Sequence, residues 1–212
     1  MRALLPLALA AVALGFAPGC SEPLLTLRPE SRSFTARDYE QVYQAWTREA
    51  DAFAFGRLSD ILNVTATFQA WEFRWAYVVR YSTDHSLLTE ARTEMLRASL
   101  ADAQENHRFF VTLSGQNYRD SDLTGEDTAW RVLLVDEEGA QSVPVEIERV
   151  DRPDPNTRAY FPSVSPFRHA FRVVFPAFHP DGRPLIAPDA GHFILRFTGP
   201  VGTVDLRWDF AP

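Results

Sequence analysis

The residues whose spacing comes closest to a chemical site lie in one acidic run. Asp120, Asp122 and Thr124 stand at alternate positions, and Gly125 follows them. Alternate oxygen-bearing side chains can turn inward on a hard cation, so a calcium site is one interpretation. The bidentate glutamate that would complete such a loop is replaced by Arg131. We therefore favour a solvated acidic loop, assign no metal site, and keep Asp120, Asp122 and Thr124 as the one calcium candidate.

The histidines are scattered along the chain, and no two of them have the spacing of a helical zinc site. His169 shares its strand position with a row of large apolar residues, which is typical of a histidine at the edge of a core. The others fall in expected bends or at expected strand ends: His85, His107, His179 and His192. The sequence thus gives no reason to expect a zinc centre.

Several nucleophile-based chemistries are excluded by composition. All 21 basic residues are arginine, so a Schiff-base lysine, a phosphate-binding loop lysine and a Ser–Lys pair are impossible. Ser114 and Gly115 supply only half of the motif around a hydrolase serine. Two carboxylate pairs fall on the strand face opposite the apolar residues, which indicates a wetted surface: Glu146 with Glu148, and Asp205 with Asp209. We assign no catalytic or cofactor-binding residue and expect a non-enzymatic protein.

The charge balance also bears on partners. The chain of 212 residues has a formal net charge of −7, whereas a nucleic-acid binder needs clustered cations to contact phosphates. Hydrophobic residues make up 46% of the chain, enough for a sizeable core. We expect one globular domain and no nucleic-acid partner.

The N-terminus has the three parts of a signal peptide. Arg2 is followed by an apolar run over residues 3–17, which is short for a membrane-spanning helix. Residues 17–20 read Ala-Pro-Gly-Cys, and Cys20 is the only cysteine, so the chain contains no internal disulfide. This tetrapeptide resembles the lipobox of bacterial lipoproteins, with Gly19 and Cys20 at the strongest positions. The resemblance covers about the first tenth of the chain.

The resemblance implies a chemical fate for the N-terminus. Residues 1–19 would be removed, and Cys20 would carry acyl chains that hold the protein stably on a membrane. Ser21 follows the cysteine, and by the enteric sorting rule the lack of aspartate there implies release to the outer membrane. We expect localisation in the cell envelope, on the periplasmic face of the outer membrane.

The first part of the mature chain predicts a tether and then a helix. Residues 20–34 mix proline, serine and charge without a period, so we expect them to reach freely from the membrane. Thr35 and Asp38 have the spacing of a capping box, and apolar residues then recur at helical spacing. We expect a helix over about residues 36–53, inside a domain that covers residues 35–212.

The next segments predict a strand and a helical insert. Residues 60–68 alternate apolar and polar side chains, as in a strand. Residues 71–81 fit either a strand or a helix, but a strong helical stripe follows them. We favour a helix hairpin of about 71–83 and 88–106, whose two stripes bury each other, and leave the strand alternative for 71–83 open.

From residue 108 onward, alternating apolar residues and turn signals predict short strands. The expected strand positions are Phe109 to Leu113, Trp130 to Leu134, Val143 to Ile147, Phe167 to Phe175, Phe193 to Phe197 and Val204 to Phe210. Glu137-Glu138-Gly139 forms a turn. With residues 60–68 this gives about seven strands. We predict an α+β fold: an antiparallel, immunoglobulin-like β-sandwich with an N-terminal helix and an inserted helix hairpin over about 71–106.

Aromatic residues are dense between Trp71 and Tyr81. Such a stripe is typical of core, although it could line an apolar groove for a lipid, a glycan or a partner. We expect a lipid-anchored envelope domain that binds a ligand or an envelope protein partner. The alternatives are a structural or assembly lipoprotein, and an envelope hydrolase or metal-dependent enzyme whose site is assembled from distant residues.

Overall fold

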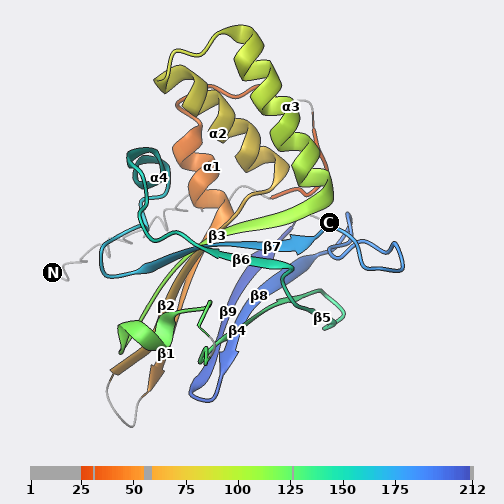
Figure 1. The fold of residues 1–212 in the computed structure, drawn as a ribbon. Coiled ribbons are helices and arrows are strands. Elements are labelled where there is room, and N and C mark those ends of the chain that lie inside the picture. The colour runs from red at the N-terminus through yellow and green to blue at the C-terminus, as the bar shows by residue number, and fades with distance from the viewer. Residues whose placement is uncertain (1–24, 31, 55–58, 126, 211–212) are drawn as a thin grey trace, which may run out of the picture.

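The structure, a computed structural model, describes residues 25–30, 32–54, 59–125 and 127–210. Over these residues the chain forms two antiparallel sheets and four α-helices (Figure 1). The five-stranded sheet has the order β1 (Thr47–Ala54), β2 (Ser59–Phe68), β3 (Asn106–Gly115), β7 (His169–Pro176), β6 (Glu146–Arg149). The four-stranded sheet has the order β5 (Gln141–Ser142), β4 (Arg131–Val135), β8 (His192–Gly199), β9 (Gly202–Asp209). The expected α+β class is confirmed.

One apolar core joins the two sheets. Alternate side chains of the strands point into it, because successive residues of a strand face opposite sides. Phe193 stacks on Trp208 with ring centroids 5.1 Å apart, and Phe68 stacks on Phe109 at 4.8 Å. Phe68 also meets Phe193 edge to face at 5.1 Å, so aromatic contacts run from one sheet to the other.

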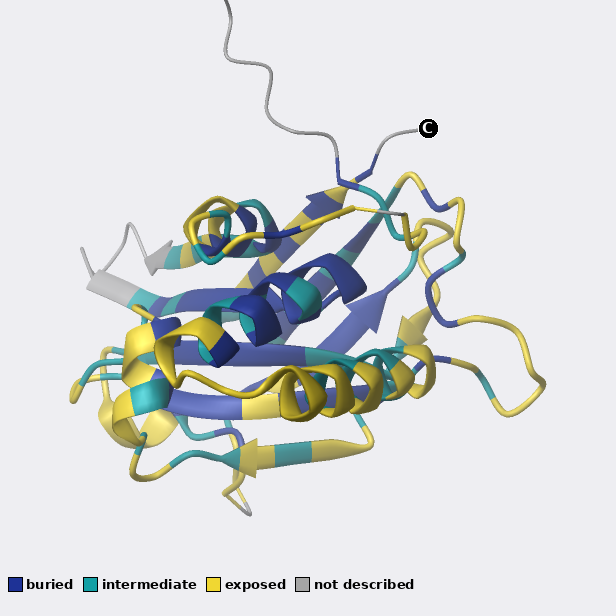
Figure 2. Ribbon diagram, turned by 90° about the horizontal axis from the view of Figure 1, so that it is seen from above, coloured by how far each residue is buried: buried dark blue, intermediate teal, exposed yellow. Residues whose placement is uncertain are grey.

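The helices cover the outer face of the five-stranded sheet (Figure 1). They are α1 (Tyr39–Trp46), α2 (Trp71–Asp84), α3 (Thr89–Glu105) and the short α4 (Pro155–Tyr160). Phe110, which points outward from β3, stacks on Phe161 just after α4 with ring centroids 4.0 Å apart. Seen from above, α2 is largely buried in the middle of this layer, whereas α3 is largely exposed (Figure 2).

The two sheets are also linked along their edges. The indole nitrogen of Trp208 in β9 donates to the carbonyl of Trp46 at 3.0 Å, next to β1. Arg48 in β1 donates from Nε to the carbonyl of Arg207 at 2.9 Å. On the other side the chain itself passes from β5 to β6, through Val143 and Val145. The sheets therefore meet at both sides of the core.

The helix expected over 36–53 is wrong before Tyr39 and beyond Trp46, and its N-cap is Asp38, where Thr35 was predicted. Residues 47–54 form β1, in which Ala50 pairs with Val64. The spacing of apolar residues in this segment fits a helix, but pairing with β2 outweighs that local preference. The expected contact between Thr35 and Asp38 does form, since the Asp38 carboxylate accepts from the Thr35 amide at 2.6 Å.

The helix hairpin is confirmed as α2 and α3, so residues 71–83 are not a strand. Its packing differs from the prediction. Among the residues of α3, none is buried, and Leu88 just before it is 75% exposed. Part of the apolar side of α2 faces α1, since Tyr39 contacts Phe73 and Tyr77 with ring centroids 5.9 and 6.3 Å apart.

The β region also differs in detail. The strand expected from Val143 to Ile147 is wrong over its first three residues, which link β5 to β6, two strands of different sheets, and only its last two residues belong to β6. Phe167 was placed on the core side of a strand, but it precedes β7 and is 82% exposed. The described residues contain nine strands where about seven were expected.

The N-terminal segment packs on the domain, so the expected tether over 20–34 is wrong from Leu25 onward. Leu25 is buried and forms a parallel bridge with Phe210, and Phe34 is buried as well. The signal peptide over 1–19 and Cys20 lie outside the described residues. Among the described helices, none has the length and apolar character needed to cross a bilayer.

Candidate functional site

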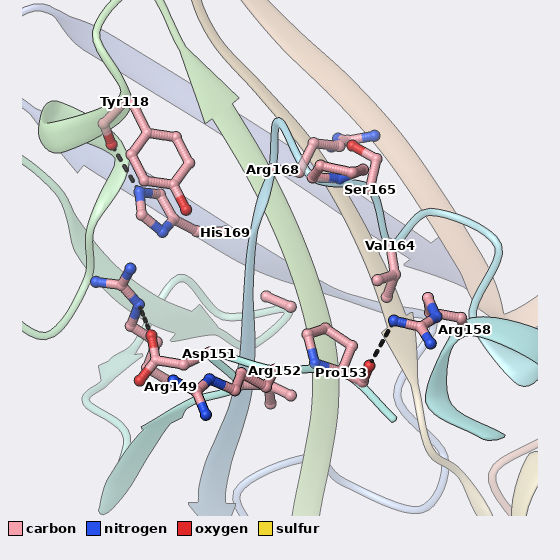
Figure 3. A pocket seen from close by; sticks show the side chains of 13 residues that line it. Tyr118, Arg149, Asp151, Arg152, Pro153, Arg158, Val164, Ser165, Arg168 and His169 are labelled. Atoms are coloured by element: carbon pink, nitrogen blue, oxygen red, sulfur yellow. Dashed lines mark hydrogen bonds and ion pairs between the residues drawn. The ribbon is translucent and has the colours of Figure 1, made fainter. Parts of the chain in front are cut away.

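A cavity of about 360 Å³ opens where β6 ends and β7 begins (Figure 3). Such a volume lies at the lower end of the range for small-molecule sites. Its walls come from the single-turn helix η1 (Tyr118–Ser121), the loop after β6, α4, and the loop that leads into β7. The polar lining residues are Tyr118, Arg149, Asp151, Arg152, Arg158, Ser165, Arg168 and His169.

Local structure fixes these walls. Strands β6 and β7 pair antiparallel, and the Val150 amide extends the pairing by donating to the Ala170 carbonyl at 2.8 Å. Asp154 caps α4 by accepting from the Thr157 amide at 2.9 Å, and Pro155 occupies the first helical turn. These bonds fix the loop after β6 and the start of α4, which follow each other along one wall of the cavity.

Four arginines line the cavity, but only one of them is neutralised. Arg149 forms ion pairs with Asp122 and Asp151, each at 2.6 Å. Arg158 donates to the carbonyl of Pro153 at 2.9 Å. Among the described residues, Arg152, Arg158 and Arg168 form no ion pair with a carboxylate. The cavity therefore carries an excess of positive charge.

Arg168 is the most constrained of these cations. Its Nη2 donates to the side chains of Asn63 and Thr65, the latter at 3.0 Å, and to the Thr112 carbonyl at 3.3 Å. All three partners are neutral, and burial lowers the pKa of the guanidinium, a cost that nearby Glu49 partly offsets. Its Nε is buried and has no hydrogen-bond partner. A buried donor without a partner is costly, and the three hydrogen bonds of Nη2 offset part of that cost.

His169 forms the opposite wall, at the start of β7. Its Nε2 lies 2.7 Å from the Tyr118 carbonyl, which can only accept, so Nε2 carries the proton of a neutral ring. The Tyr118 ring lies against the imidazole, tilted by 31° with ring centroids 3.7 Å apart (Figure 3). The second nitrogen, Nδ1, is buried without a partner. A neutral ring in this tautomer offers Nδ1 as an acceptor, and a protonated ring offers it as a donor.

The cavity contains the residue types of a hydrolase, but they are not connected. Asp151 is paired with Arg149, and Ser165 accepts from the Phe167 amide at 3.4 Å. Figure 3 shows Ser165 and His169 on different sides of the hollow. A nucleophile must be bonded to its base and the base to an orienting group.

The calcium candidates lie next to this cavity and are engaged in other bonds. Asp122 accepts from the amide and the hydroxyl of Thr124 at 2.9 and 2.8 Å, and also pairs with Arg149. Burial alone would raise the pKa of Asp122, but these partners lower it overall. Asp120 accepts from Asn117 at 2.9 Å. The run thus forms a hydrogen-bonded turn that anchors one wall of the cavity.

The histidines lie apart in the fold. His85 contacts Asn156 at 3.2 Å, His179 lies in a turn closed by Gly182, and His192 begins β8. His107 begins β3 beside Phe68. Within the described ranges, no three histidine, aspartate, glutamate or cysteine side chains gather as a metal site would require.

The cavity residues were not predicted as a site. The sequence does carry one signal, because Arg149, Arg152, Arg158 and Arg168 fall within twenty residues of an acidic chain. These four arginines indicate a site only once β6 and β7 pair, because that pairing brings the two ends of the stretch close together. Compared with protein families, curated proteins and solved structures, the chain matches none of them.

Proposed function

We propose that this protein is a lipid-anchored component of the bacterial cell envelope whose domain binds a small anionic ligand in the arginine-lined cavity. The observation that carries the proposal is a set of three arginines around one hollow of a chain with net charge −7. Arg152, Arg158 and Arg168 have no ion pair within the part of the chain that the structure describes. Guanidinium groups match the planar, multidentate geometry of carboxylates and phosphates. The domain therefore acts as a binding module, without a catalytic relay.

The two unpaired buried atoms narrow the class of ligand. Arg168 Nε is a donor, and Nδ1 of a neutral His169 is an acceptor. Both atoms are buried in the structure, so the ligand reaches them only when the lining side chains shift. A ligand that then satisfies both has an anionic oxygen on one side and a hydroxyl on the other. A sugar phosphate or a sugar carboxylate has this combination and fits about 360 Å³.

Calorimetric titration tests the binding site. Glucose 1-phosphate should bind more tightly than inorganic phosphate, and uncharged glucose should not bind. Arg158→Gln should weaken glucose 1-phosphate binding roughly tenfold, since it removes a charge-assisted hydrogen bond. Arg97→Gln is the matched control, because Arg97 is an exposed arginine of α3 paired only with Glu94. Equal affinities of Arg158→Gln, Arg97→Gln and unchanged protein would refute the assignment.

The anchor is tested separately. We propose that Cys20 carries the lipid and that residues 1–19 are removed, on the strength of the lipobox-like residues 17–20. Cys20→Ala should move the protein from the membrane fraction to the soluble periplasmic fraction, or leave it uncleaved. Incorporation of labelled fatty acid into Cys20→Ala at the normal level would end this proposal.

We further infer that the two sheets form a sandwich, since both contribute to one core. A closer relation to immunoglobulin domains rests only on this general architecture, because the five-stranded sheet joins β1, β2 and β3 in chain order.

An envelope protein partner is a further proposal. Exposed apolar residues at the tip of the helix hairpin, such as Leu88, would form the contact surface for that partner.

A further inference from the structure

A second cavity, of about 320 Å³, lies at the end of the domain where β2 passes into α2 and α3 passes into β3. It is separate from the arginine-lined cavity, and its lining is mainly apolar. Trp71, Trp75 and Leu100 from the helices face Phe178 and Ile186 from the loop between β7 and β8. The remaining wall comes from Leu27 and Pro29 of the N-terminal segment.

The position of this apolar pocket relative to the anchor is set by chain length. Leu25 is fixed by its bridge to Phe210, and Cys20 precedes it by five residues. Five residues span at most about 17 Å even when fully extended. If Cys20 is lipidated, the pocket therefore lies close to the bilayer surface. Figure 1 shows this end of the domain near the label C.

The rim of the apolar pocket is suited to that position. Phe178 is 53% exposed, and the prolines at positions 29, 184 and 188 are exposed beside it. An exposed apolar rim around an apolar hollow marks a binding surface. Arg28, next to the rim, has no carboxylate partner among the described residues, so it can meet the phosphate of a lipid headgroup.

The interior of the pocket is suited to an uncharged ligand. His107 contributes to the wall, and its Nε2 is buried without a partner. Burial, aided by the charge of Arg74, lowers the pKa of His107 to about 4. The ring is therefore neutral near pH 7, and no ionised group lines the pocket, whose other polar lining residues are Gln69, Gln104 and Asn106.

We propose that this pocket takes an acyl chain of a bilayer phospholipid, so that the domain rests on the membrane with this end down. The proposal rests on the anchoring through Cys20, because the short reach from Cys20 to Leu25 is what brings the pocket to the bilayer. The occupant is a lipid of the surrounding membrane, and the lipid attached to Cys20 stays in the bilayer.

The pocket tryptophans supply the test. The lipidated protein is reconstituted in phosphatidylcholine vesicles whose acyl chains carry bromine, which quenches indole fluorescence on contact. Of the five tryptophans, Trp71 and Trp75 line the pocket, whereas Trp46, Trp130 and Trp208 are buried in the core. We expect quenching of roughly a third of the emission, and a Trp71→Phe, Trp75→Phe double variant should lose it.

Two helix variants distinguish pocket entry from surface contact. Ala103 of α3 lines the pocket, and Ala101 of the same helix is exposed and does not. Ala103→Phe should halve the quenching or more, whereas Ala101→Phe should leave it unchanged. Phe178→Asp, at an exposed position, gives a second block should Ala103→Phe fold poorly. Equal quenching in all of these variants would overturn the proposal.

Flotation of the vesicles tests membrane attachment through Cys20 independently of lipid binding in the pocket. Protein that floats without quenching refutes the pocket assignment and leaves the anchor intact. If the protein does not float, the full chain with Cys20→Ala is titrated with a brominated lysophospholipid below its micelle concentration. Quenching that saturates in this titration supports acyl-chain binding in the pocket without the anchor. Absence of quenching refutes acyl-chain binding in the pocket.

Discussion

Burial controls the chemistry of His107 at the start of β3. Removal from water disfavours the charged imidazolium, and the nearby Arg74 cation adds to this effect, so the pKa of His107 falls to about 4. In an unfolded chain the pKa of a histidine is about 6.5. The unfolded state therefore binds a proton between these two values, and the folded state does not.

This difference predicts a pH dependence of stability. The contribution of His107 is fully present above about pH 6.5 and is lost as the pH falls through the folded pKa near 4. We expect a loss on the order of 3 kcal/mol across that window. His107→Gln should flatten this part of the profile in urea unfolding measured from pH 7 to 4. His179→Gln, in a surface turn, should follow the unchanged protein, and a shared slope for all three would contradict the assignment.

Glu72 is a buried carboxylate with two partners. It accepts from the indole nitrogen of Trp46 at 2.8 Å and pairs with Arg32, which ties the N-terminal segment to α2. Glu72→Ala leaves the Trp46 N–H buried without a partner, which should cost about 2 kcal/mol of unfolding free energy. Glu94→Ala, in an exposed pair with Arg97, should cost less than about 0.5 kcal/mol. The free energies of unfolding are measured by denaturant titration. Equal losses in the two variants would show that the buried contact contributes no more stability than the exposed one.

At the scale of elements, the sequence pattern predicted the helices and strands whose formation depends on residues close together in the chain. The strand over 60–68, the two helices of the hairpin and the terminal β8–β9 pair were all predicted and appear at nearly those bounds. Strand β1 was missed because the apolar spacing around Trp46 and Ala50 also suits a helix, and only pairing with β2 decides between the two. Phe167 was misplaced because the strand starts two residues later, a boundary that alternation alone does not show.

The turn between β8 and β9 requires a close approach that only glycine allows. A Cβ on Gly199 would lie 2.1 Å from the backbone oxygen of Ala129, which cannot move aside easily. Gly199→Ala should therefore cost about 2–3 kcal/mol of stability. Gly125→Ala, where a Cβ meets nothing within 4 Å, should change stability by less than about 0.5 kcal/mol. Thermal melting distinguishes these outcomes. An unchanged melting temperature in Gly199→Ala would mean that the backbone at Ala129 moves aside.

At the scale of the whole molecule, neither cavity could be predicted from the sequence. The arginine-lined cavity joins η1 to residues 149–170, and the apolar pocket joins residues near positions 27, 71, 103 and 178. Such assemblies depend on strand order and on how the helices sit on the sheet, which no local period encodes. The expected tether failed for the same reason, since the partner of Leu25 is Phe210 at the far end of the chain.

The short reach from Cys20 to Leu25 predicts an effect of linker length. Ten glycine and serine residues inserted after Ser21 would raise the reach of the anchor by up to about 35 Å. Vesicle flotation should stay unchanged, because it depends on the lipid. Quenching of Trp71 and Trp75 by brominated chains should fall several-fold, because a flexible linker lowers the effective concentration of the pocket at the bilayer. Ten residues inserted after Gly139, in a remote turn, serve as the control, and equal quenching in both would argue against a role for the short reach.

The parallel bridge between Leu25 and Phe210 has a mechanical consequence. The N-terminal segment is held both there and by the indole nitrogen of Trp71, which donates to the Thr26 carbonyl at 3.3 Å. A pull exerted through Cys20 therefore reaches the domain at two adjacent points, one at the end of β9 and one at the start of α2. If Cys20 is anchored, tension on it is therefore shared between the smaller sheet and the helical layer, and does not fall on one strand alone.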